Sequence, residues 1–267
     1  YKNARFGRIE AHEAICAWAR EILLQTIEQA QKRGWNVLHA IVDSIWIQDT
    51  KGRTLDEQHT SAMELAQYVH GMTGIPLEYE ATYRCIAFVS SRMHNGGSLT
   101  KYWAYGDDGL KIRGLELRQH STCSWITQLQ QHALEMLAGT EDLVEGVPSY
   151  RVQCRVRNLL IDALNRLEHH QVPPEELVIA QRLSRKPSPH STQTVAMLAS
   201  QRSEALGFPL ELASKVRFIV CMKNQKNPLE RVVLARELNV RQNIPRRIDV
   251  QYYRQLAIRA IWAILSP

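Results

Sequence analysis

NVLHAIVDSIWIQ, residues 36–48, is the stretch that decides the fold of the first part of the chain. Two apolar runs meet at Asp43-Ser44, a pair of residue types that is common in tight turns. The pattern predicts a β-hairpin with a single carboxylate, Asp43, at its turn. Stiff strands around an exposed carboxylate suit a binding or catalytic role. Aspartate is also common at turns for backbone reasons alone, and the hairpin by itself favours that interpretation.

The segments around this hairpin predict an α+β fold. Apolar residues recur at intervals of three and four in residues 7–33 and 56–72, which indicates two amphipathic helices. Strand-like runs follow, separated by turn signals rich in Asn, Asp and Gly, at residues 77–89, 99–105 and 110–117. Short connections between successive strands favour a largely antiparallel sheet packed with helices.

The sequence changes character near residue 120, where we place a domain boundary between residues 1–120 and 121–267. Helical patterns dominate the second part, at residues 125–137, 151–169, 191–206 and 248–265. Residues 1–120 contain 14 Lys and Arg against 14 Asp and Glu, whereas residues 121–267 contain 19 against 13. A neutral part joined to a basic part indicates a polyanionic partner for the second. On charge alone, a basic solvated surface is an equally good interpretation.

Composition argues against several classes of protein. No apolar run approaches the ~18 residues of a membrane-spanning helix, so no membrane partner is expected. The five cysteines are scattered without a CxxC pair, which is typical of free thiols in a reducing cytosol and argues against a zinc site. The chain starts at Tyr1, and residues 1–8 are typical of the interior of a longer sequence, so we expect a fragment or a processed subunit.

Three stretches together resemble the C-terminal part of a B-family DNA polymerase: YKNARFGRIEAHEAICAWAREIL at 1–23, HAIVDSIWIQ at 39–48 and LKIRGLELRQHST at 110–122. In that family the first is similar to the helix that re-enters the palm. The second is similar to the hairpin of the third polymerase motif, and the third to a Lys-x-Arg-Gly strand that leads to the thumb. The resemblance implies a palm portion over 1–120, with helices and a largely antiparallel sheet. A mostly helical thumb that binds duplex DNA would follow over 121–267.

The resemblance also implies a function in nucleotidyl transfer. The family motif usually reads Tyr-Gly-Asp-Thr-Asp-Ser, and Asp43 matches its second aspartate. That aspartate is a ligand in a two-Mg²⁺ site, which activates the primer 3′-hydroxyl for attack on a dNTP. Ile41 stands where the first aspartate is usual, and Val42 replaces the threonine. In this respect the chain is similar to archaeal and bacterial relatives with a degenerate third motif.

Two further motifs of the family do not occur in the sequence: the motif with the other metal-binding aspartate, and the fingers motif whose lysine contacts the incoming nucleotide. The resemblance therefore implies that an upstream polymerase portion, in the same chain or in a separate subunit, completes the site. This chain alone is expected to be inactive. The alternative is a non-catalytic, inactivated polymerase-like subunit that binds DNA or serves a structural role. In either case we expect a cytoplasmic, nucleoid-associated protein.

The same resemblance gives candidate contacts to primer-template DNA. In the palm portion these are Arg92, Lys101, Tyr102, Lys111, Arg113 and Arg118, and in the thumb they are Arg182, Arg185 and Lys186. Lys111 and Arg113 are two residues apart, so they share one face of a strand, and Gly114 permits close backbone approach. Such cations hold phosphates without reading the sequence of the bases. Two tryptophans, Trp46 and Trp262, are expected in the hydrophobic core.

Overall fold

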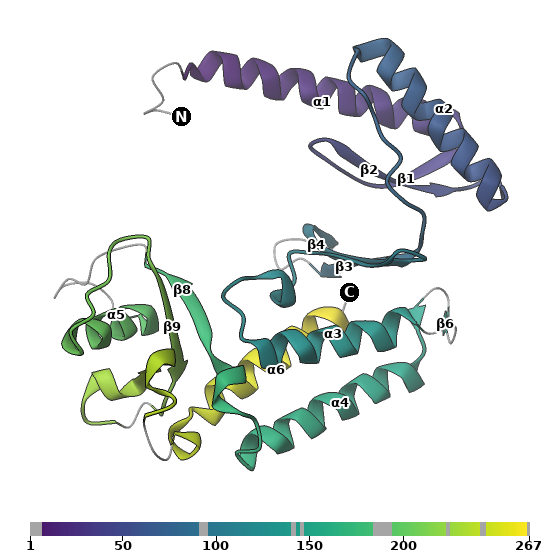
Figure 1. Ribbon diagram of the computed structural model, residues 1–267. Coiled ribbons are helices and arrows are strands. Elements are labelled where there is room, and N and C mark those ends of the chain that lie inside the picture. Colours follow the sequence, from purple (N-terminus) through teal and green to yellow (C-terminus); the bar gives the residue numbers. More distant parts are fainter. Residues whose placement is uncertain are drawn as a thin grey trace. The chain divides into compact units, whose positions relative to one another are not determined.

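The computed structural model describes residues 7–90, 96–139, 143–144, 147–183, 194–222, 225–240 and 244–265; of residues 143, 144 and 147 it describes the backbone alone. The chain divides into two compact units, Tyr1–Thr82 and Tyr83–Pro267. Helices and antiparallel strands occur in both units (Figure 1), which confirms the predicted α+β fold.

The first unit is a β-hairpin with a helix on either side of it in the sequence. Its elements are α1 (Ile9–Lys32), β1 (Trp35–Ile41), β2 (Ser44–Asp49) and α2 (Leu55–Thr73). A small core of Ala30, Trp35, Leu65 and Val69 packs α1, β1 and α2 together. The hairpin and both helices predicted from the sequence are therefore confirmed.

The start of α2 is fixed by a reciprocal cap. The backbone N–H of Glu57 donates to Thr54 Oγ1 at 3.3 Å, and the backbone N–H of Thr54 donates to Glu57 Oε2 at 2.8 Å. Gly74 ends the helix in the left-handed conformation, with φ of 73°. These two caps fix both ends of α2.

The second unit begins with a three-stranded antiparallel sheet in the order β3-β4-β5, made of β3 (Tyr83–Ser90), β4 (Gly97–Gly106) and β5 (Gly109–Arg113). The strand predicted over residues 77–89 starts later, because residues 75–82 have no regular secondary structure. The strand predicted over 110–117 ends at Arg113, and the chain continues into the short 3-10 helix η1 (Glu116–Arg118).

The larger hydrophobic core lies in this second unit. Helices α3 (Ser124–Ala138), α4 (Tyr150–Glu168) and α6 (Val250–Leu265) pack against one another, as Figure 1 shows. A second antiparallel sheet has the order β10-β9-β8 and is packed with α5 (Val195–Ala205). Its strands are β8 (Ile179–Arg182), β9 (Lys215–Val220) and β10 (Val232–Leu234). The remaining short elements are β6 (Leu143–Val144), β7 (Val147–Pro148), η2 (Pro174–Leu177), η3 (Pro228–Arg231), η4 (Ala235–Glu237) and η5 (Pro245–Arg247).

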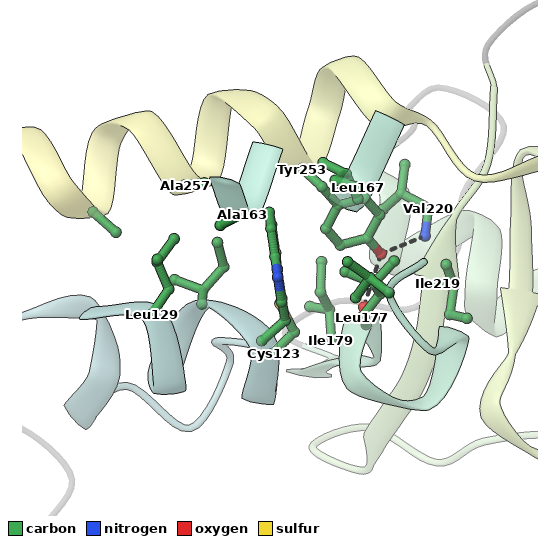
Figure 2. Packing of buried hydrophobic residues seen from close by; sticks show 14 of the residues in the cluster. Cys123, Leu129, Ala163, Leu167, Leu177, Ile179, Ile219, Val220, Tyr253 and Ala257 are labelled. Carbon is green, nitrogen blue, oxygen red and sulfur yellow. Dashed lines mark hydrogen bonds between the residues drawn. The ribbon is translucent and has the colours of Figure 1, made fainter. Parts of the chain in front are cut away.

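Tyr253 joins α6 to this second sheet. Its fully buried hydroxyl accepts a hydrogen bond from the backbone N–H of Val220 at 3.0 Å and donates one to the carbonyl oxygen of Leu177 at 2.8 Å (Figure 2). Burial raises the pKa of this hydroxyl well above its usual value, so it remains protonated and able to donate.

The compact units do not coincide with the boundary predicted near residue 120. Trp103 of β4 and Leu115 share one core with Leu134 of α3 and Ile264 of α6. The sheet β3-β4-β5 therefore belongs structurally with the C-terminal helices. The palm and thumb assignment of residues 1–120 and 121–267 is a functional division, and it stays a prediction.

The expected burial of Trp262 is wrong. Its side chain lies on the outer face of α6 and is 63% exposed, because Ala260, Ile261 and Ile264 supply the buried face of that helix. Trp46 in β2 is half-buried.

Candidate active-site hairpin and nucleic-acid interface

Asp43 lies at the turn of the β1–β2 hairpin, where its side chain is exposed. The strands pair from Trp35 opposite Asp49 at the open end to Ile41 opposite Ser44 at the turn. The hydroxyl of Ser44 donates to the carbonyl oxygen of Ile41 at 3.3 Å and helps to close the turn. The hairpin thus holds one carboxylate out to solvent on two paired strands.

Val42 gives this turn an unusual backbone. Its φ is +54°, in the left-handed region that β-branched residues avoid, and its side chain is 73% exposed. Exposure means that no burial of the isopropyl group offsets the cost. Strained residues of this kind persist where surrounding structure enforces them, and they cluster at functional sites. The strain therefore lies directly beside the candidate carboxylate.

The described residues supply one candidate metal ligand. Among them no group of three His, Cys, Asp or Glu side chains is placed to hold a metal ion. Asp43 fits the role of a Mg²⁺ ligand, because Mg²⁺ prefers hard oxygen ligands and this carboxylate is exposed. Ile41, which stands at the position of a usual aspartate, is apolar and adds no ligand. The hairpin can therefore provide part of a metal site and needs further ligands from elsewhere.

Asp49, the other aspartate of the hairpin, has a structural role. It lies at the open end of the strands, and its carboxylate accepts hydrogen bonds from the backbone N–H groups of Arg53 and Lys51 at 2.8 and 3.2 Å. It also forms an ion pair with the Arg53 guanidinium at 3.1 Å. Burial pushes the pKa of Asp49 upward, but these hydrogen bonds and the Arg53 charge outweigh it and lower the pKa.

Lys111 and Arg113 share one face of β5, as predicted. They pair with Ala104 and Tyr102 of β4, while Ile112 points to the opposite face and packs on the core. Arg113 is exposed, and the Lys111 ammonium lies 6.0 Å from the centre of the Tyr83 ring. The sheet thus presents two cations away from the core.

Gly114 allows a close approach within the chain itself. Its φ is +71°, and a Cβ atom at this position would overlap the carbonyl oxygen of Thr100 in β4. The glycine is therefore required by the neighbouring strand, which gives it a role that does not depend on bound DNA.

Lys101 and Tyr102 are neighbours on β4, so their side chains leave opposite faces. Lys101 is exposed, whereas Tyr102 is only 1% exposed and its ring lies 5.6 Å from that of Phe88. Burial leaves Tyr102 little surface for a DNA contact and makes it a support for the sheet. Arg118, in η1, and Arg182, at the end of β8, are exposed. The predicted contacts Arg92, Arg185 and Lys186 lie outside the described residues.

Two cations were missed by the sequence reasoning. The register of β8 with β9 places Lys215 opposite Arg182 and Arg217 opposite Ala180. The alternation Lys-Val-Arg-Phe at residues 215–218 was a usable signal, because it puts both cations on one face of a strand. The pairing with β8 was not readable from that pattern.

Comparisons with known proteins identify relatives across nearly the whole chain. Residues 9–267 match the family model for DNA polymerase family B. A DNA polymerase of Archaeoglobus fulgidus is 26% identical over 208 residues, which cover 78% of this chain and 24% of that protein. A DNA polymerase of Desulfurococcus sp. (strain Tok) is 24% identical over 257 residues, which cover 95% of this chain and 30% of that protein. The chain thus spans less than a third of the length of these relatives.

The fold agrees with a solved structure. The family B DNA polymerase from Pyrobaculum calidifontis matches with a TM-score of 0.62 and 20% sequence identity, covering 98% of this chain and 30% of that one. Within the described part of the chain, no helix is both long and apolar enough to span a membrane. The family match covers both compact units, and the resemblance inferred from the three sequence stretches is confirmed. The chain belongs to family B of the DNA polymerases.

Proposed function

We propose that this chain is the C-terminal palm and thumb portion of a DNA-directed DNA polymerase, which adds nucleotides from dNTPs to a primer 3′-hydroxyl during DNA replication. The observation that carries the proposal is the exposed Asp43 at the turn of a paired hairpin, in a chain that matches the family B model over residues 9–267. The palm function is assigned to residues 1–120 and the thumb function to residues 121–267. The protein is expected in the cytoplasm, associated with the nucleoid.

Asp43 is proposed as a ligand of a two-Mg²⁺ site. When bound, the ions activate the primer hydroxyl and neutralise the charge that develops on the transferred phosphoryl group. This chain contributes one carboxylate, and the paired strands β1 and β2 fix its position. The remaining ligands and the contacts to the incoming nucleotide are assigned to an upstream polymerase portion. On this proposal the chain alone does not polymerise.

The DNA is held by cations that contact phosphates. Four of the predicted contacts are exposed in the described residues: Lys101, Arg113, Arg118 and Arg182. A fifth, Lys111, is half-buried and lies beside Arg113 on β5. The excess positive charge of residues 121–267 supports the same proposal for the thumb. Arg92, Tyr102, Arg185 and Lys186 complete the predicted set.

Ile41 favours a second candidate, a polymerase-like subunit that binds DNA without catalysis. An apolar side chain at the position of the usual first aspartate removes negative charge that would support bound cations. The two candidates differ in whether Asp43 is needed for synthesis.

Primer extension tests both candidates. The chain is assayed together with an upstream polymerase portion, Mg²⁺, dNTPs and a primer-template, beside its Asp43→Ala variant. Loss of one metal ligand is expected to cost about 3 kcal/mol or more in the barrier, which is a rate loss on the order of 100-fold or greater. Asp108→Ala is the matched control, because Asp108 is also an exposed turn carboxylate but lies between β4 and β5. Bound primer-template without extension by any version would support the non-catalytic subunit.

A further inference from the structure

One face of the β8–β9 ladder carries three cations. Arg182 of β8 stands directly opposite Lys215 of β9, and Ala180 stands opposite Arg217. Because successive side chains of a strand point to opposite faces, these four share one face. Val216 and Phe218, between and beyond the β9 cations, point the other way and are buried. The ladder therefore has one core face and one cationic face at this end.

The three cations are exposed and close together. Directly opposite side chains have Cβ atoms about 5 Å apart, and next-but-one residues along a strand are about 7 Å apart. Arg182, Lys215 and Arg217 are all exposed. No carboxylate in the described part of the chain forms an ion pair with any of them. Arg217 has the small Ala180 across from it on β8.

This arrangement costs stability in the isolated chain. Like charges directly opposite on neighbouring strands repel and destabilise a sheet. An anion bound across the ladder would relieve that repulsion at all three positions. The three cations are spread along two paired strands, which suits an extended chain of phosphates better than a single small anion.

We propose that Arg182, Lys215 and Arg217 form one phosphate-binding face that holds the backbone of a nucleic-acid strand without reading its bases. The inference rests on the proposed function and deepens it, because it assigns Lys215 and Arg217 to the DNA interface and joins them to Arg182 as a unit. The face carries three cationic side chains, and the residue opposite Arg217 on it is the small Ala180. Sequence-independent backbone contact is what such a set of side chains can provide.

The salt dependence of duplex binding tests the proposal. The 267-residue chain and its triple variant Arg182→Gln, Lys215→Gln, Arg217→Gln are titrated with a labelled primer-template over a range of salt concentrations. Each lost phosphate contact removes about 0.9 from the slope of log K against log salt, so the triple variant should lose about 2.7. The loss should be the same for duplexes of unrelated sequence.

A charge-matched control separates a specific face from net charge. The triple variant Arg20→Gln, Lys32→Gln, Arg166→Gln removes three exposed cations of α1 and α4, and its slope should equal that of the parent. Equal slopes for the parent and the β8–β9 variant would overturn the inference and leave the proposed function standing. Absence of salt-dependent binding by the parent would overturn both. If polyglutamate bound the parent as tightly as the duplex does, and the β8–β9 triple variant lost that binding too, the assignment to nucleic acid would be overturned.

Lys215→Glu provides a second, independent readout. The new carboxylate stands opposite Arg182, so the repulsion across the ladder becomes attraction and the thermal midpoint should rise. Duplex affinity should fall at the same time, by more than in an Arg166→Glu control. A higher thermal midpoint with duplex affinity equal to that of the control would overturn the proposal, because the cations would then be solvated surface only.

Discussion

Arg202 and Glu237 form a buried bidentate ion pair that joins α5 to η4. Arg202 Nε lies 2.6 Å from Glu237 Oε2, and Arg202 Nη2 lies 2.8 Å from Glu237 Oε1. The remaining guanidinium nitrogen donates to the carbonyl oxygen of Leu229 at 2.7 Å and to Glu230 at 3.1 Å. The hydrogen bonds that Arg202 donates to Glu237 raise the pKa of Arg202 above its usual value. The pair fixes α5 against the region that follows β10 in the same unit as the cationic ladder.

Replacing Arg202 by methionine should destabilise the chain strongly. The variant has a side chain of similar volume but removes the guanidinium that pairs with the buried Glu237 carboxylate, which costs about 3–5 kcal/mol. Urea unfolding at neutral pH measures the loss. The double variant Arg202→Met, Glu237→Leu removes both charges and should recover most of the stability. Equal stability of the single variant and the parent would mean that the pair contributes nothing to the fold.

Asp49 should make the stability of the first unit depend on pH. Its pKa in the folded chain is lowered from the usual 3.8, so the folded state holds this proton less tightly than the unfolded state does. The stabilisation is therefore present above about pH 4 and is lost as the pH falls below that value, through the folded pKa. Asp49→Asn should lower stability at pH 7, and the difference from the parent should narrow toward pH 3.

Urea midpoints of the parent and Asp49→Asn between pH 7 and pH 3 measure this dependence. Asp108→Asn serves as the control, because that carboxylate is exposed in a turn and should give midpoints close to those of the parent at every pH. If the urea midpoint of Asp49→Asn stays below that of the parent by the same amount down to pH 3, the hydrogen bonds stabilise the neutral side chain as much as the charged one.

Gly114→Ala should destabilise the second unit by about 1–3 kcal/mol, because it combines steric overlap with the Thr100 carbonyl and a backbone that alanine avoids. Gly109→Ala separates the two effects. Gly109 also has a positive φ, of +97°, but a Cβ atom there meets nothing within 4 Å. The thermal midpoint should be lowest for Gly114→Ala, higher for Gly109→Ala and highest for the parent. Equal losses would assign the whole effect to the backbone conformation.

The sequence predicts local elements well here because their periodicity is strong. The two apolar runs that meet at Asp43-Ser44 and the three-four spacing in residues 7–33 each specify an element without help from the rest of the chain. Trp262 shows where this reasoning fails. Its apolar character predicts burial. The face of α6 that is buried includes Tyr253 and Ala257, and because apolar residues occur all round this helix, their spacing alone does not show that Trp262 lies on the other face.

Long-range pairing explains the rest of the difference between prediction and structure. Arg182 and Lys215 lie on strands separated by α5, so only the register of β8 with β9 brings their charges together. The burial of Tyr102 is also a long-range effect, because it depends on the pairing of β4 with β3. The hairpin could be recognised as a candidate site from the sequence because Asp43 and its flanking strands are contiguous.

Val42→Gly should stabilise the chain by about 1 kcal/mol, because glycine adopts a φ of +54° without the steric penalty that valine pays there. The exposed valine side chain has little burial to lose. Val240→Gly is the control: Val240 is also highly exposed, but its φ is negative, so glycine should leave stability unchanged or lower it. Urea unfolding of both variants measures the difference. A lower midpoint for Val42→Gly than for the parent would show that the hairpin carries no strain at this turn.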